Sequence, residues 1–206
     1  MATLSPCLSR CDDQPEVLGA IRDADCNLAI WERAPFADFA PLIAGNPQDL
    51  RFTCDAAGLP ALLEAGLDRG GYGGDSALRR ALISDAARLA ALFCAALDLA
   101  KLELRLEVVR TDSCRKFHAD YVTARLITTY VGEGTDWLDE DDAARVAAGA
   151  APVRVRRLRA FDVGLFKGKL ATETPAIHRS PPIAGTGAAR LLLVLNPAHR
   201  SFVDGA

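Results

Sequence analysis

The sequence has no uninterrupted apolar stretch of the roughly 20 residues that a helix needs to cross a bilayer. Residues 1–14 also lack the basic segment, followed by an apolar core, that marks a secretory signal. The six cysteines include no C-x-x-C pair, so their spacing predicts neither a zinc ribbon nor a compact disulfide framework. We therefore expect a cytoplasmic protein with free thiols and no membrane partner.

The sequence also has no excess of positively charged residues. Lysine and arginine number 24 against 27 aspartate and glutamate residues, which gives a formal net charge of -3. This balance argues against general binding of nucleic acid. With 206 residues, 50% of them apolar and 25% charged, the chain is long enough and apolar enough for one packed domain.

The first half of the chain is predicted to be mainly helical. Residues 1–15 show no periodic pattern and are expected to be a flexible N-terminus, so the domain comprises residues 16–206. Its helical part covers about 16–100. The glycine-rich run 69–75 is predicted to be a connector, because no Lys-Ser/Thr pair follows it as in a phosphate-binding loop. From Ser76 to about Ala100, apolar residues recur at helical spacing and predict a long amphipathic helix.

From about residue 101 to 198 the pattern changes to that of β-structure. Leucines and charged residues alternate strictly in Leu102–Val108, which predicts a strand with one buried face. Three further runs are rich in β-forming residues: Tyr121–Val131, Val153–Phe166 and Arg190–Leu195. Helices followed by an antiparallel sheet or barrel define an α+β fold class.

Two of the three histidines occupy positions that suit a metal site. In the segment Phe117-His118-Ala119-Asp120, an extended backbone places the imidazole and the carboxylate on the same side of the chain. His178, about sixty residues later, can complete a triangular face from a distant strand. Two histidines and one carboxylate on one face, with the opposite positions open, suit non-heme Fe(II) in oxygenases. We therefore predict that His118, Asp120 and His178 bind one metal ion.

The succession of strand, His-x-Asp, strand, glycine turn, strands, histidine and arginine resembles the 2-oxoglutarate and Fe(II)-dependent oxygenases. This resemblance implies a distorted double-stranded β-helix, jelly-roll or cupin-like, with the helical part packed on it. It implies Fe(II) and 2-oxoglutarate as cofactors and a small-molecule or peptide substrate. Arg190, twelve residues after His178, would bind the distal carboxylate of the cofactor. Thr129 or Tyr130, which face opposite sides of the preceding strand, would add a hydroxyl donor.

A longer set of motifs is similar to an uncharacterised bacterial family whose domain has no known function. The matching segments are Cys114–Asp120, Arg125-Leu126, Thr129–Gly132, Gly134–Trp137 and His178–Pro182. Members of that family are often encoded beside zinc-metallochaperone GTPases, so the resemblance implies an association with such a GTPase. It brings no established activity.

The same residues allow other interpretations. Cys114, four residues before His118, could close a four-ligand zinc site, and the protein would then be a non-catalytic zinc or iron binder in metal homeostasis. Arg179 could replace Arg190 as the carboxylate anchor or pair with an acidic side chain. The arginines between Arg154 and Arg159 could bind an anion, although their alternation with apolar residues favours a strand with a solvated face. In a further alternative, the histidines are merely structural residues of a β-barrel interaction module.

Overall fold

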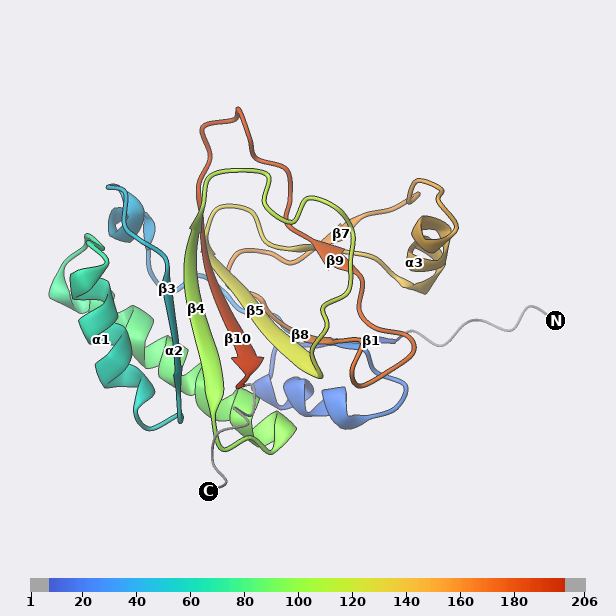
Figure 1. The fold of residues 1–206 in the computed structure, drawn as a ribbon, viewed down its shortest axis with the longest axis horizontal. Helices are drawn as coiled ribbons and strands as arrows, with labels where there is room; N and C mark the ends of the chain where they lie inside the picture. Colours follow the sequence, from blue (N-terminus) through green and yellow to red (C-terminus); the bar gives the residue numbers. More distant parts are fainter. Residues whose placement is uncertain (1–7, 199–206) are drawn as a thin grey trace, which may run out of the picture.

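Strands and helices both occur along residues 8–198, which are the residues that this computed structural model describes (Figure 1). The strands are β1 (Ser9–Asp12), β2 (Leu28–Trp31), β3 (Leu50–Cys54), β4 (Leu102–Val109), β5 (Ala124–Val131), β6 (Asp136–Trp137), β7 (Arg156–Arg157), β8 (Val163–Lys167), β9 (His178–Arg179) and β10 (Arg190–Pro197). The helices are η1 (Pro15–Arg22), η2 (Ala40–Ile43), α1 (Leu59–Arg69), α2 (Ser76–Leu97) and α3 (Glu140–Ala147), of which η1 and η2 are 3₁₀-helices.

The strands form one large and one small sheet. Seven strands make the large sheet in the order β1-β2-β8-β5-β10-β4-β3, and three make the small sheet in the order β7-β6-β9. Within the large sheet β1 and β2 are parallel and all other neighbours are antiparallel. The mixed α+β class expected from the sequence is confirmed. No helix in the described part of the chain is long and apolar enough to cross a membrane.

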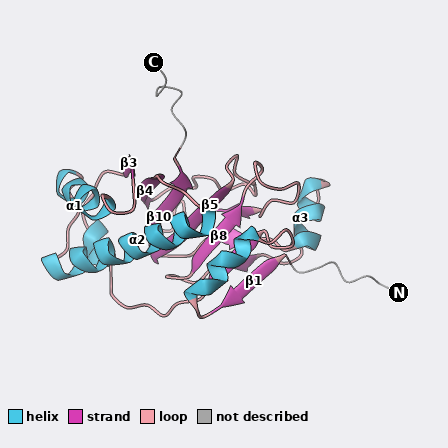
Figure 2. Ribbon diagram, turned by 90° about the horizontal axis from the view of Figure 1, so that it is seen from below, coloured by secondary structure: helices cyan, strands magenta, loops and turns pink. Residues whose placement is uncertain are grey.

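Helices α1, α2 and η1 lie on one face of the large sheet (Figure 2). Helix α2 begins at Asp75, whose carboxylate accepts a hydrogen bond from the Leu78 amide and so satisfies a backbone donor that the helix leaves free. Its fully buried Leu82, Leu89 and Phe93 belong to the same core as the strand leucines on this face. The helical spacing in the sequence therefore marks the side of α2 that packs against the sheet.

The opposite face of the large sheet carries a second, smaller core. Ile127 of β5 and Phe166 of β8 cluster there with Trp137 of β6 and with Leu158. This cluster packs the small sheet against the large one. Side chains that point inward from either sheet therefore meet in the space between them, away from the helices.

The order of helices first and strands second does not describe this fold. Strands β1, β2 and β3 come from the first half of the chain and lie at the two ends of the large sheet, where they contain only four or five residues. The sequence predicts a short strand at Leu28–Trp31, which forms β2, but a period of two cannot be recognised in β1 and β3. Residues 9–12, expected to be flexible, form β1, and residues 1–7 lie outside the described part.

The run 153–166 is also broken, although the sequence predicts one strand there. It forms β7 and β8 with a turn between them, in which Phe161 has a φ of 73° and Asp162 accepts a hydrogen bond from the Arg159 amide. Only Arg156 and Arg157 of the arginine run belong to a strand. The turn directs β8 into the large sheet and leaves β7 in the small one.

A buried ion pair joins α2 to the large sheet. The Asp85 carboxylate of α2 accepts hydrogen bonds from Arg33 Nη1 and from the Tyr130 hydroxyl, both at 2.6 Å. The side chains of Arg33 and Asp85 are only 7% and 8% exposed. Burial, together with the neighbouring Asp85, raises the pKa of Tyr130 well above its usual value, so its hydroxyl stays protonated and donates. Asp85 thus satisfies two groups that have little access to water.

Replacing Asp85 by alanine should therefore lower the free energy of unfolding by about 3–5 kcal/mol, because it leaves a buried guanidinium uncompensated. Urea unfolding followed by circular dichroism measures the change. The matched control is Asp68→Ala, which removes a carboxylate that is 66% exposed and pairs with Arg79. That substitution should cost less than about 1 kcal/mol. Equal costs for the two variants would contradict the role given to Asp85.

Candidate metal centre

His118 and His178 are held side by side by a pair of backbone hydrogen bonds. The His118 amide donates to the His178 carbonyl and the His178 amide donates to the His118 carbonyl, each at 2.9 Å. His178 belongs to β9 and pairs with Trp137 of β6, which fixes it in the small sheet. Because directly opposed residues in an antiparallel pair project to the same side, the two imidazoles lie next to each other on one face. Their ring centroids are 4.8 Å apart.

Each imidazole is oriented by a carbonyl group two residues earlier in the chain. His118 Nδ1 lies 2.9 Å from the Lys116 carbonyl and His178 Nδ1 lies 3.2 Å from the Ala176 carbonyl. A carbonyl oxygen can only accept, so both Nδ1 atoms carry the proton. The Nε2 atoms of the neutral rings then present lone pairs, which is the form in which histidine binds a metal.

Asp120 completes the group. Its Oδ1 lies 3.7 Å from His118 Nε2 and its Oδ2 lies 3.2 Å from His178 Nε2. Oδ2 is buried and has no hydrogen-bond partner in the described part of the chain. With the His178 proton on Nδ1, two lone pairs face each other across 3.2 Å. Such a contact is favourable only when a proton or a metal cation lies between the two atoms.

The charge of Asp120 is secured by its surroundings. Burial acts to raise the pKa of this carboxyl, but the neighbouring His178, Arg125 and His118 side chains outweigh it, and the pKa lies below its usual value. Arg125 Nη1 donates to Asp120 Oδ1 at 2.6 Å, and Arg125 Nε donates to Asn196 Oδ1 at 2.7 Å. This second layer orients the carboxylate, as outer partners do at metal sites.

The three donors fit a divalent cation. One ligand atom from each of His118, Asp120 and His178 lies within 4.8 Å of the others. Two ligand atoms at right angles on an ion with bonds of about 2.1 Å are about 3.0 Å apart, close to the separations at Asp120. Two imidazoles and one carboxylate suit non-heme iron, and among the described residues no fourth ligand joins them. The three residues predicted from the sequence are thus brought together.

Cys114 lies outside this group. It is exposed, adopts a φ of 54°, and its carbonyl accepts a hydrogen bond from the Ser180 amide. The thiol is therefore not among the atoms that converge on the site, and the closed four-ligand arrangement considered from the sequence is not formed.

Arg190 is the largest fully buried side chain in the described part of the chain, and its partners there are all neutral. Its guanidinium donates to the Glu133 carbonyl and to the hydroxyls of Ser180, Thr129 and Thr135, at 2.6 to 3.5 Å. Burial lowers the pKa of Arg190 to about 10, despite the neighbouring charge of Asp136. A buried cation without a carboxylate partner is costly and favours binding of an anion.

Arg190 and the histidines are linked through the segment that contains β9. Ser180, which touches Arg190, follows His178 by two residues, and two residues of extended chain span about 6.6 Å. The Arg190 guanidinium therefore lies beside the segment of chain that carries His178. Ser180 was not singled out in the sequence, although its period-two spacing from His178 could have indicated it.

Thr129 and Tyr130 lie on opposite faces of β5. The Thr129 hydroxyl accepts from Arg190 Nη2 at 3.2 Å, on the side of the small sheet. The Tyr130 hydroxyl instead donates to Asp85 on the helical side. Because side chains alternate along a strand, only one of the two can share a site with Arg190. The cofactor-binding role expected of Tyr130 does not fit this placement.

The alternative anchor, Arg179, is engaged elsewhere. Arg179 Nε donates to Asp136 Oδ2 at 3.0 Å, and its guanidinium stacks on the Phe117 ring. Arg157 binds the other Asp136 oxygen, so Asp136, which is fully buried, is shared by two arginines. Arg190 thus differs from its arginine neighbours in having no direct ion pair within the described residues.

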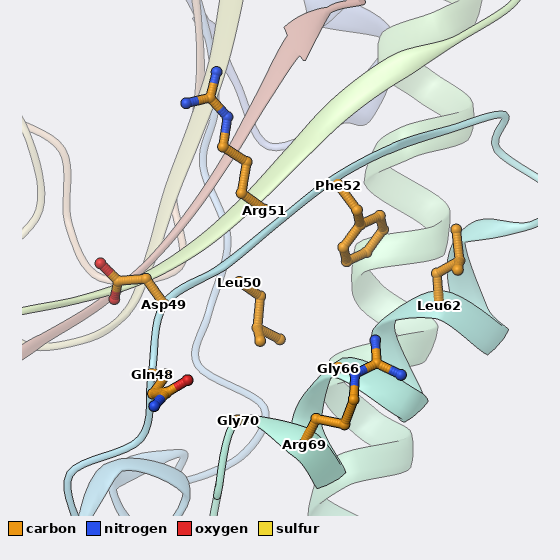
Figure 3. Close-up of a pocket in the computed structure, with 9 residues that line it drawn as sticks. All are labelled: Gln48, Asp49, Leu50, Arg51, Phe52, Leu62, Gly66, Arg69 and Gly70. Carbon is orange, nitrogen blue, oxygen red and sulfur yellow. The ribbon is translucent and has the colours of Figure 1, made fainter.

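The groove in Figure 3 is separate from these residues. It lies between β3 and α1, at the end of the large sheet formed by β3, has a volume of about 240 Å³ and contains none of the metal-binding group. Leu50 and Phe52 of β3 point toward α1 and form part of its apolar lining, whereas the Arg51 side chain points away from α1 and pairs with Glu103 (Figure 3).

Replacing Asp120 by asparagine should weaken metal binding by more than about a hundredfold, since loss of even an outer partner costs ten- to a hundredfold. The substitution keeps the side-chain size and an oxygen for Arg125 but removes the only negative ligand. Competition with a chromophoric chelator measures the affinity for Fe(II) and Zn(II). Asp112→Asn is the control, since that carboxylate binds the amides of Ile183 and Ala184 outside the group. A metal affinity that is equal in both variants would contradict the assignment.

No curated protein matches the chain. Similar solved structures include dioxygenase for auxin oxidation 1 from Arabidopsis thaliana in a binary complex with 2-oxoglutarate (TM-score 0.48, 12% identity, 84% of this chain and 68% of that chain). A prolyl-4-hydroxylase from Pseudomonas putida has a TM-score of 0.44 and 15% identity over 91% of this chain and 94% of that chain. The dioxygenase for auxin oxidation in rice has a TM-score of 0.44 and 17% identity over 78% and 61%. A family model described as a protein of unknown function, DUF1826, matches residues 12–196. The chain therefore belongs to the DUF1826 family.

Proposed function

We propose that the protein is a mononuclear Fe(II) and 2-oxoglutarate-dependent oxygenase. The observation that carries the proposal is a pair of incompletely paired groups of opposite charge, the Asp120 carboxylate and the Arg190 guanidinium. Three lone-pair donors, with a buried and unpaired Asp120 oxygen among them, converge where a cation would bind. A buried Arg190 without an acidic partner lies nearby, where an anion would bind. One dicarboxylate chelating the cation and reaching the arginine satisfies both.

In this proposal the two sheets form a distorted double-stranded β-helix. The large sheet provides Arg190 and Thr129, and the small sheet provides His178. The apolar cluster around Phe166 and Trp137 packs beside His178 and limits the access of water. A site that is dry on this side strengthens each electrostatic contact in it.

Each residue has a distinct task in the proposed reaction. His118, Asp120 and His178 would hold the iron, which together with 2-oxoglutarate supplies the oxidation of a C–H bond by dioxygen. Arg125 keeps the Asp120 carboxylate charged and oriented. Arg190 would bind the distal carboxylate of 2-oxoglutarate through two parallel N–H donors.

The hydroxyl groups around Arg190 can give way to a bound carboxylate. Those of Ser180 and Thr129 accept hydrogen bonds from the guanidinium in this structure. A hydroxyl can also donate, so both can turn their protons toward an incoming carboxylate. The carboxylate would replace neutral acceptors with a charged one, and the interaction with the buried cation becomes stronger.

The second candidate is a metal carrier that uses the same three ligands. The open coordination of the group favours the enzyme, since storage and structural zinc sites have a closed shell of four protein ligands. Association with a zinc-metallochaperone GTPase stays a prediction from the sequence resemblance.

Addition of 2-oxoglutarate to the anaerobic Fe(II) protein should produce a visible absorption band, and Arg190→Met should weaken 2-oxoglutarate binding by more than about thirtyfold. That loss follows because truncating one side of a buried charge pair costs about 2 kcal/mol or more. Titration of the band measures the affinity. Metal stoichiometry should stay unchanged, because Arg190 touches none of the three metal-binding residues.

Arg179→Met is the matched control for this test. It makes the same substitution one residue from His178, at an arginine whose charge is already paired with Asp136. The control should keep the affinity for 2-oxoglutarate within about threefold, because Arg179 donates to Asp136 and not to any group that contacts Arg190. A wild-type Fe(II) protein that shows no band would contradict the oxygenase proposal and favour the metal carrier. A loss of 2-oxoglutarate affinity in Arg179→Met but not in Arg190→Met would show that Arg179, and not Arg190, binds the distal carboxylate.

A further inference from the structure

A row of three side chains crosses the small sheet from the metal centre to its far strand. Trp137 of β6 pairs directly with His178 of β9 on one side and with Arg156 of β7 on the other. Directly opposed residues project to the same face of a sheet. His178, Trp137 and Arg156 therefore share one face, and each step across the row is about 5 Å. The Arg156 guanidinium lies over the Trp137 ring, 5.3 Å from its centroid.

The far end of this row opens into a groove of about 340 Å³. Its apolar wall includes Ile30, Trp137 and Leu158, which belong to the core between the two sheets. Arg154 and Arg156 also line it. A volume of this size, with an apolar wall and a few polar groups, is within the range of small-molecule sites.

The groove has a surplus of positive charge that its own acids do not neutralise. Of the two carboxylates that line it, Asp162 binds Arg159 and the Arg33 amide, and Glu32 also pairs with Arg159. Arg154 is exposed, and its guanidinium has no ion pair among the residues that the structure describes. The electrostatic complement of the groove is therefore an anion.

Arg156 is held only weakly by its acidic partner. Its distance to the Asp139 carboxylate is 3.2 Å, and the two side chains are 40% and 27% exposed. An exposed pair of this kind contributes little, so the guanidinium can transfer to a better-placed anion at small cost. It can do so while keeping its contact with Trp137.

We propose that this groove binds a small organic anion, with an anionic head group at Arg154 and Arg156 and an apolar body lying along Trp137 toward His178. The inference rests on the proposed function, and it names the substrate class of the same site: an organic anion whose apolar part lies against Trp137 and points toward the metal centre. The anionic head is a carboxylate or a phosphate, and the two are separated by experiment.

The test uses the fluorescence of Trp137 in the full chain carrying Trp31→Phe, since the protein has only these two tryptophans. Three quenchers of equal ring size serve as probes: 4-nitrobenzoate, 4-nitrophenyl phosphate and the neutral 4-nitrobenzyl alcohol. The proposal predicts saturable quenching by at least one of the two anions, at least about fivefold tighter than by the alcohol. The tighter of the anions identifies the head group. Equal affinity for all three probes, or no saturable quenching, would overturn the proposal.

Two variants locate the anionic head. Arg154→Ser should weaken the favoured anion by about threefold to fivefold and leave the alcohol unchanged. Arg145→Ser is the control, because it removes the same charge from α3, outside the groove, and should change neither probe. Asp139→Asn should instead tighten anion binding by about threefold, since it frees Arg156 while an asparagine still caps α3. A purely structural role for these residues gives no gain in affinity.

A second measurement places the probe relative to the metal. With Mn(II) bound at the triad, the ring protons of the favoured anion should relax faster than with Zn(II), and Asp120→Asn should remove the difference. Identical relaxation with the two metals would contradict a ligand that extends toward His178. The fluorescence titration is carried out on metal-free protein, so its failure would reject this inference while leaving the iron and 2-oxoglutarate band intact.

Discussion

The reciprocal backbone hydrogen bonds between His118 and His178 fix the part of the molecule on which the proposed chemistry depends. They join a loop that precedes β5 to the short strand β9, segments that are sixty residues apart. Each imidazole is then turned by a carbonyl two residues earlier, so both unprotonated nitrogens face Asp120. Because backbone groups set this arrangement, the rings are oriented before any metal binds, and little conformational freedom is lost on binding.

The two faces of the large sheet have separate tasks. On the helical face the charges are paired within the protein, as Arg33, Asp85 and Tyr130 show. On the other face the charges are incompletely paired: Asp120 has an oxygen without a partner, and Arg190 has only neutral partners among the described residues. Buried groups that are satisfied stabilise a fold, whereas those left unsatisfied usually indicate a ligand. This difference between the faces supports the proposal that one of them stabilises the fold and the other binds the ligands.

The sequence predicts the features that rest on a long period or on a short local motif. Helix α2 and strand β4 repeat their patterns for long enough to be recognised, and the His-x-Asp spacing places His118 with Asp120. The small sheet cannot be predicted from the sequence, because each of its strands has only two residues. Consequently the row from His178 through Trp137 to Arg156, which depends on strand register, could not be found. The roles of Thr129 and Tyr130 could not be assigned from the sequence either. The alternation of side chains along a strand places them on opposite faces, but it does not indicate which of the two faces Arg190.

X-ray absorption spectroscopy of the Fe(II)-loaded protein can decide whether two imidazoles and one carboxylate hold a metal whose other positions are open. We expect only nitrogen and oxygen atoms bound to the iron, with scattering from two imidazole rings and the remaining positions filled by solvent. A sulfur ligand at about 2.3 Å would contradict it, because a cysteine thiolate would then close the site. Scattering from a single imidazole would contradict it equally.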